Sequence, residues 1–153
     1  MNVWQLAVAS SSGEAELRIA GNSSSSSLLD MGQRHLDAAP ESAQVGEETV
    51  TTARLDDALA RSLGDDACVY PRIDVQGAEL DVLAGAEEVL RRTDVVDCEL
   101  SLVPLYVGGS SWTQVIEHLA ARGFGLLWLE PVLRDSTTHE LLQMDELFVR
   151  TVP

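Results

Sequence analysis

The stretch that decides the fold reads Ile73-Asp74-Val75-Gln76-Gly77-Ala78-Glu79. It ends an apolar strand pattern over residues 67–75, which Pro71 interrupts, and it leads through a Gln-Gly bend into a predicted helix over residues 78–92. Open α/β sheets bind ligands outside the carboxyl ends of their strands, where helix N-termini also point. Asp74 is therefore expected to project over a ligand crevice. The residues alone leave the chemistry of that crevice open.

The predicted helix over residues 78–92 has one apolar face. Its apolar residues recur three or four positions apart, which is the spacing of a single helix face. They are Val82, Leu83, Ala86, Val89 and Leu90. We expect this face to cover a sheet.

The segments downstream continue the alternation of strands and helices. Residues 95–102 are predicted to form a strand. Ser111 and Gln114 have the spacing of a capping box, so a helix is expected to begin there and to end at Gly123. The expected inner face of that helix consists of Trp112, Val115, Ile116 and Leu119.

The C-terminal part is predicted to be extended. A strand is expected over residues 125–133, a turn over 135–140, and extended segments over 141–143 and 147–149. The last two segments are joined by a short turn, so we expect them to form an antiparallel pair.

The segments upstream are less regular. Strands are expected over residues 4–9 and 15–20, an extended segment over 50–54 and a helix over 55–63. Between them, residues 21–48 are predicted to form a flexible Ser-rich loop. Such a loop is either a solvated linker or a lid over a bound cofactor.

Composition and charge exclude several classes of partner. The chain has 153 residues, with ten arginines, no lysine and 25 acidic residues, which gives a net charge of −15. A field of this sign repels nucleic acid and anionic membrane surfaces. There is no membrane-length apolar run and no secretory signal pattern, so a cytoplasmic location is the expectation. Cys68 and Cys98 are expected to be buried free thiols.

Several segments together resemble the FkbM family of S-adenosylmethionine-dependent methyltransferases. The most characteristic are Ile73-Asp74-Val75-Gln76-Gly77-Ala78-Glu79 with Val82-Leu83-Ala84-Gly85-Ala86-Glu87, and Glu99-Leu100-Ser101-Leu102-Val103-Pro104-Leu105-Tyr106. Further similar segments are Leu6–Ser10, Ser25–Leu28, Arg54–Asp57, Gly123-Phe124 and residues 141–149. The resemblance implies a partial Rossmann-like, class I methyltransferase α/β fold, with a mostly parallel sheet and an antiparallel C-terminal hairpin. It also implies methyl transfer from S-adenosylmethionine to a hydroxyl oxygen of a small molecule such as a sugar or polyketide.

The resemblance also suggests roles for individual residues. Asp74 is expected to act as the base or to position the acceptor, and Gln76 and Glu79 would support it. Glu99 is expected to lie at an exposed strand end near the site, or else to pair with an arginine. Ala9 and Ser10 would flank the adenine of the cofactor, beside Asp74.

Structural roles are the alternatives for two of the acidic residues. Asp74 would then cap the following helix, and Glu79 would complement its dipole. No metal is expected, because His35, His118 and His139 are not spaced for one metal centre.

The sequence departs from the family pattern in its cofactor loop. The family's Asp-Val-Gly-Ala-Asn-x-Gly-like loop and its ribose-binding acidic residue are absent. We therefore expect residues 1–153 to form one FkbM-type domain that lacks its first two strand–helix units and is impaired as an enzyme. The strand over residues 4–9 would then lose both neighbours, and the strand over 67–75 would become an exposed sheet edge. Such an edge invites pairing with a second copy. The alternatives are a non-catalytic interaction module and a protein whose true start lies upstream.

Overall fold

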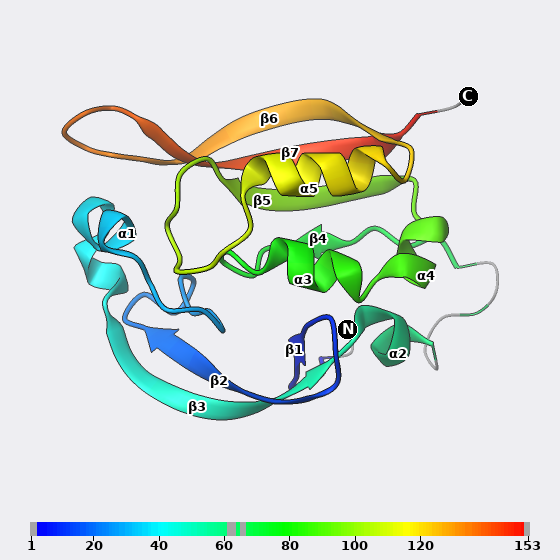
Figure 1. Cartoon of the computed structure of the whole chain (residues 1–153), viewed down its shortest axis with the longest axis horizontal. Coiled ribbons are helices and arrows are strands. Elements are labelled where there is room, and N and C mark those ends of the chain that lie inside the picture. Colours follow the sequence, from blue (N-terminus) through cyan, green and yellow to red (C-terminus); the bar gives the residue numbers. More distant parts are fainter. Residues whose placement is uncertain (1–2, 61–63, 65–66, 152–153) are drawn as a thin grey trace.

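The computed structural model describes residues 3–60, 64 and 67–151. The elements are, in order, β1 (Ala7–Val8), β2 (Gly13–Ala20), α1 (Gln33–Ala38), η1 (Pro40–Ser42), β3 (Gln44–Ala53), α2 (Leu55–Leu59), β4 (Arg72–Ile73), α3 (Glu79–Ala84), α4 (Glu87–Arg91), β5 (Val95–Ser101), α5 (Trp112–Ala120), β6 (Phe124–Arg134) and β7 (Leu141–Arg150). They form an α/β structure with two sheets (Figure 1). None of the described helices has the length and apolar character needed to cross a membrane.

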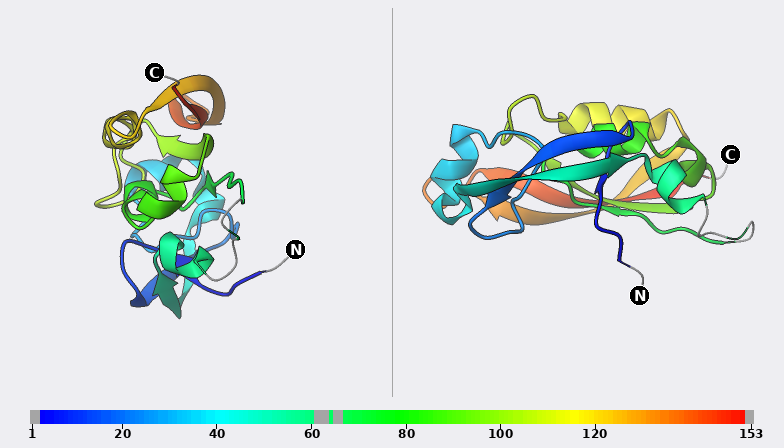
Figure 2. Two further views of the ribbon diagram at one scale, coloured as in Figure 1. Left: turned by 90° about the vertical axis from the view of Figure 1, so that its right-hand side faces the viewer. Right: turned by 90° about the horizontal axis from the view of Figure 1, so that it is seen from below.

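The first sheet has three strands in the order β1-β3-β2. β1 runs parallel to β3, with Ala7 opposite Thr52, and β2 runs antiparallel to β3. Figure 2 shows β2 and β3 as a long twisted ribbon. The expectation that the strand over residues 4–9 loses both neighbours is therefore wrong, because β3 pairs with one side of it.

The segment predicted to be a Ser-rich loop, residues 21–48, contains regular structure. It includes α1, η1 and the first five residues of β3. The side-chain nitrogen of Asn22 donates to the hydroxyls of Ser25 (3.0 Å) and Ser42 (2.9 Å), which ties the serine turn to η1. The start of β3 has no apolar alternation, because its residues 44–48 are almost all exposed, and this explains why the sequence pattern did not reveal it.

The second sheet has four strands in the order β4-β5-β7-β6. Only β4 and β5 are parallel, whereas β7 runs antiparallel to both β5 and β6. The prediction of a mostly parallel sheet is therefore wrong. The reason is that β7 inserts between β5 and β6, two strands that run in the same direction and would otherwise form a parallel pair.

The C-terminal hairpin also differs in detail from the expectation. The two short segments predicted over residues 141–143 and 147–149 form one continuous strand, β7. Its antiparallel hairpin partner is β6, across the predicted turn.

β4 lies at an edge of its sheet, as expected for the segment over residues 67–75. The regular strand is only Arg72–Ile73, because Pro71 precedes it and lacks an N–H. The carbonyl of Pro71 still accepts a hydrogen bond from the amide of Asp97 (3.0 Å).

The helix predicted over residues 78–92 is two helices, α3 and α4, which are separated at Gly85 and Ala86. The side chain of Asp56 causes this break, since one carboxylate oxygen accepts from the amides of Glu88 and Val89 (3.0 Å each) and starts a new helix. In return, the amide of Asp56 donates to the carbonyl of Gly85 (3.0 Å). The helix predicted over residues 55–63 is α2, and residues 61–63 lie outside the described part of the chain.

The core lies between the four-stranded sheet and α3, α4 and α5, which pack on one of its faces (Figure 1). The apolar face predicted for residues 78–92 is buried throughout. The capping box of Ser111 and Gln114 is present at α5, but Trp112 is 39% exposed rather than inward. Cys98 is buried, and Cys68 is exposed, contrary to the prediction.

One carboxylate lies inside this core. Glu146 of β7 is 1% exposed, and neither of its side-chain oxygens has a hydrogen-bond partner among the described residues. Its cross-strand neighbour on β5 is the buried Cys98. Burial raises the pKa of Glu146 to about 7.

Candidate functional site

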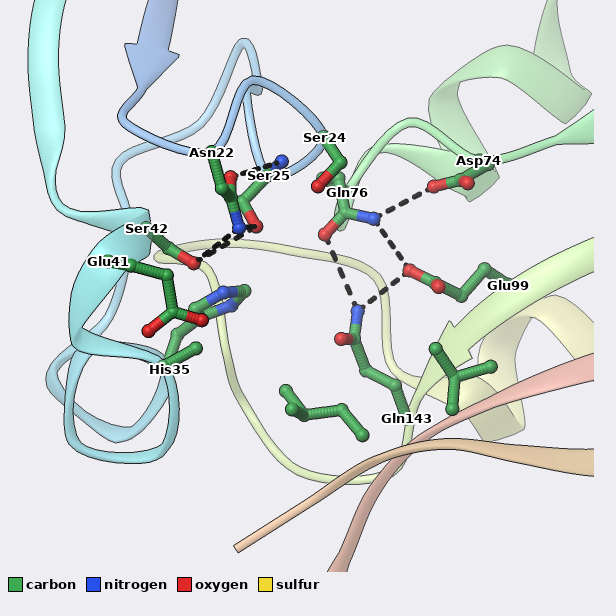
Figure 3. A pocket seen from close by; sticks show the side chains of 13 residues that line it. Asn22, Ser24, Ser25, His35, Glu41, Ser42, Asp74, Gln76, Glu99 and Gln143 are labelled. Atoms are coloured by element: carbon green, nitrogen blue, oxygen red, sulfur yellow. Dashed lines mark hydrogen bonds between the residues drawn. The ribbon is translucent and has the colours of Figure 1, made fainter.

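A pocket of about 300 Å³ opens where β4 and β5 end, opposite the serine turn and η1 (Figure 3). Leu133 and Val132 of β6 form part of its apolar wall. Ten polar side chains line it: Asn22, Ser24, Ser25, His35, Glu41, Ser42, Asp74, Gln76, Glu99 and Gln143. The predicted Asp74, Gln76 and Glu99 therefore lie at one site.

The bend after β4 is held in an unusual conformation. Gln76 has a φ of 54° and Gly77 a φ of 98°, so two successive residues are left-handed. A Cβ on Gly77 would lie 2.9 Å from the Cβ of Tyr106, which only glycine avoids. The carbonyl of Gln76 accepts from the hydroxyl of Ser27 (2.8 Å). Left-handed backbone at a non-glycine residue costs on the order of 1 kcal/mol or more, and the surrounding contacts must hold it.

The amide of Gln76 connects the two carboxylates of the site. Its nitrogen donates to Asp74 (2.8 Å) and to Glu99 (2.6 Å). Its oxygen lies 2.9 Å from the hydroxyl of Tyr106. The amide nitrogen of Gln143 gives Glu99 a second hydrogen bond (2.9 Å). The side chains of this site are thus held in fixed relative positions before any ligand binds.

Glu99 is the carboxyl group whose acidity is most altered at this site. It is 7% exposed, and burial together with the nearby Asp74 charge raises its pKa to about 7, against the hydrogen bond from Gln76. The sequence predicted two alternative positions for Glu99, one near the site and one paired with an arginine. No described arginine pairs with Glu99, and the side-chain amides of Gln76 and Gln143 donate to it instead. A carboxyl with a pKa near 7 can both accept and release a proton at neutral pH.

His35 of α1 forms another part of the pocket wall. Its side chain is 2% exposed, and its ring contacts the ring of Tyr106 edge-on, with centroids 5.2 Å apart. Its Nδ1 has no hydrogen-bond partner among the described residues. Burial lowers the pKa of His35, with Glu41 opposing the effect, so the imidazole is neutral near pH 7.

Comparison with family models identifies the chain's relatives. Residues 1–126 match the model described as the methyltransferase FkbM domain. The chain belongs to the FkbM methyltransferase family. No curated protein and no solved structure matches the chain.

Membership of the FkbM family implies S-adenosylmethionine as the cofactor. The residues predicted to bind this cofactor do not lie together in the structure. Ser10 lines a different pocket, of about 490 Å³, and its amide donates to Asp81 (3.1 Å). Ala9 is buried, with its carbonyl 2.3 Å from where a Cβ on Gly85 would stand. Asp74 lines the first pocket. These three residues do not form one cavity and do not fit a cofactor that must contact all of them.

Glu79 also lies apart from the pocket of this FkbM domain. It is 2% exposed, and one of its oxygens accepts from the amide of Gly77 (2.8 Å). Burial raises its pKa. Glu79 therefore stabilises the bend from inside. Asp74 accepts from Gln76, and the amide of Leu80 in the first turn of α3 donates to the hydroxyl of Ser110 (3.0 Å), so Asp74 does not take the predicted capping role.

Several other residues that line the pocket were not among the predicted site residues. Asn22, His35 and Glu41 are far from Asp74 in sequence and reach it only through the fold of α1 and η1. Gln143 had a detectable signal, because it is a polar residue inside the apolar segment Leu141-Leu142-Gln143-Met144. A buried amide in such a segment requires a hydrogen-bond partner, and for Gln143 that partner is Glu99.

Proposed function

We propose that this FkbM domain binds a small hydroxyl compound, such as a sugar or another natural product, and accepts its hydroxyl proton during methyl transfer from S-adenosylmethionine. The family membership supports methyl transfer. The observation that carries the proposal is the Gln76 amide, which holds Asp74 and Glu99 side by side at the pocket wall.

In this proposal Glu99 accepts the proton and Asp74 positions the acceptor. A hydroxyl must lose its proton as its oxygen takes the methyl group, and a base works best when its pKa is near the working pH. Glu99, with a pKa of about 7, meets that condition. Asp74 is exposed beside it and is available to a ligand. Gln76 and Gln143 orient Glu99.

S-adenosylmethionine would supply an electrophilic methyl group to the acceptor oxygen. Because Ala9, Ser10 and Asp74 do not line one cavity, we expect this chain alone to bind the cofactor weakly and to be impaired in catalysis. Calorimetric titration of the 153-residue chain tests this, and a micromolar Kd would contradict it.

The proposal of proton acceptance is tested by methyl transfer from labelled S-adenosylmethionine to a panel of sugars and polyols. We expect Glu99→Gln to lower the rate about 10²-fold or more, because positioned acid–base groups contribute about that factor. The matched control is Glu48→Gln, which changes an exposed residue of β3 outside the pocket. Equal rates for Glu99→Gln and the unchanged chain would contradict the assignment.

A second candidate function is self-association through the edge of β4. An apolar groove of about 210 Å³ runs along this edge. Its apolar wall includes Val8, Leu55, Leu59, Ile73, Val75 and Val82. An open strand edge beside apolar side chains favours pairing with another strand. Light scattering after size exclusion should detect a dimer, and Tyr70→Glu should disrupt it. A monomer at a protein concentration on the order of 100 µM, where contacts of this kind form, would rule out this function.

A further inference from the structure

The carboxamide donors of the pocket are already used within the protein. Each carboxamide nitrogen has two hydrogens. Gln76 uses both on Asp74 and Glu99, and Asn22 uses both on Ser25 and Ser42. Gln143 directs its nitrogen at Glu99 and, at 3.5 Å, at the oxygen of Gln76. The three amides therefore have no N–H left for a ligand.

The acceptors of the pocket are, by contrast, in excess. Glu41, Asp74 and Glu99 line it together, and no arginine is among its lining residues. None of these three carboxylates takes part in an ion pair between described residues, although seven arginines of this part of the chain pair with other acidic groups. The pocket thus combines negative charge with unused acceptor atoms.

A separate observation indicates that a hydrogen-bond partner is missing at the same place. His35 lines the pocket and is only 2% exposed. Its Nδ1 has no hydrogen-bond partner within the part of the chain that the structure describes. Figure 3 shows its ring beside Glu41 and Ser42 on the pocket wall. Because a buried ring nitrogen without a partner is costly, a bound molecule that forms a hydrogen bond with it would recover that cost.

We infer that this pocket takes a hydroxyl compound that also carries a protonated amine, such as an amino alcohol or an amino sugar. The inference rests on the proposed function, in which the same pocket holds the methyl acceptor. The ammonium group supplies three donors and a positive charge to the carboxylates. The hydroxyl group lies toward Glu99, and a further polar group of the ligand pairs with Nδ1 of His35.

The size of the pocket agrees with a small ligand. A volume of about 300 Å³ is at the lower end of the range for small-molecule sites. It suits a single polyol or sugar unit, which is either the whole ligand or one ring of a larger one.

The test is a set of NMR titrations of the ¹⁵N-labelled 153-residue chain at pH 7.5 and low salt. The probes are ethanolamine and 1-amino-1-deoxysorbitol, and their uncharged counterparts are ethylene glycol and sorbitol. We expect at least one amine to bind ten times or more tighter than its counterpart, with amide shifts at Ser24, Gln76 and Gly77. Equal affinities of an amine and its counterpart would overturn the inference. No binding of either amine at 10 mM would also overturn it, because even a modest site is expected to have a Kd of about 1 mM.

Variants test whether the pocket carboxylates recognise the charge. Glu41→Gln and Asp74→Asn should each weaken binding of the amine threefold or more, and Glu41→Gln should leave binding of the uncharged probe unchanged. Glu48→Gln, outside the pocket, should change neither. Glu41 is exposed on η1, so its substitution does not threaten folding. Unchanged amine affinity in both pocket variants would overturn the inference.

These titrations contain no cofactor, so they are independent of methyl transfer. Charge-selective binding, together with a methyl-transfer rate that Glu99→Gln leaves unchanged, would support the inference and refute the proposed function. Turnover of uncharged polyols without preference for amines would support the proposed function and refute the inference.

Discussion

Glu146 should make the stability of the chain depend strongly on pH. Its carboxylate is 1% exposed in the core beside Cys98, and burial raises its pKa from 4.5 to about 7. Because the folded chain binds this proton more tightly than the unfolded chain, the stabilisation is fully present below pH 4.5 and is lost as pH rises through about 7. A shift of this size corresponds to roughly 3 kcal/mol, of which about 2 kcal/mol should disappear between pH 5 and pH 8.

Urea denaturation at pH 5 and pH 8 measures this effect. The free energy of unfolding of the unchanged chain should fall by about 2 kcal/mol more over this interval than that of Glu146→Gln, which cannot ionise. Glu146→Leu should be the more stable protein at pH 8, because an unpaired buried charge is costly. The control Glu130→Gln removes an exposed carboxylate of β6 and should keep the pH dependence. If Glu146→Gln and the unchanged chain lose the same free energy, the carboxylate is not buried as described.

Three further predictions concern the bend, the helix break and Glu99. Gly77→Ala should destabilise the chain by about 2 kcal/mol or more, because Gly77 has a φ of 98° and the added Cβ would clash with Tyr106. Thermal unfolding measures this, and an unchanged Tm would contradict this account of the bend. Asp56→Ala should cost ~1 kcal/mol in urea denaturation by removing the cap of α4, whereas a similar loss from the exposed neighbour Asp57→Ala would argue against a specific cap. Gln143→Leu should raise the pKa of Glu99 above 7 by removing a hydrogen bond to the charged form, and carboxyl-carbon NMR titration would show a higher midpoint. An unmoved or lower midpoint would mean that Gln143 does not stabilise the ionised carboxylate.

Local patterns in the sequence predicted the elements that depend on local physics. The apolar spacing around Val82 and Leu83 placed the core face correctly, and Ser111 with Gln114 placed the start of α5. The carboxyl end of β4 was correctly expected to hold Asp74 beside a pocket. In each case the residues that determine the structure lie within a few positions of one another.

The features that the sequence did not reveal depend on contacts between distant residues. The break between α3 and α4 is caused by Asp56, about 30 positions upstream, so apolar spacing alone predicted one helix. The sheet was predicted to be mostly parallel because strand–helix alternation does not show where the last strand inserts. Similarly, His35 joins the pocket only because α1 folds back toward β4, and no local pattern marks it.

The position of β7 has a consequence for how the protein is made. β7 (Leu141–Arg150) follows β6 in the chain, and it is an inner strand of its sheet and the only described partner of β6. Until the ribosome has added these residues, β6 has no partner strand and one edge of β5 stays unpaired. The four-stranded sheet therefore cannot be completed before translation reaches Arg150, and an early stop codon that removes β7 should leave β6 unpaired and destabilise the domain.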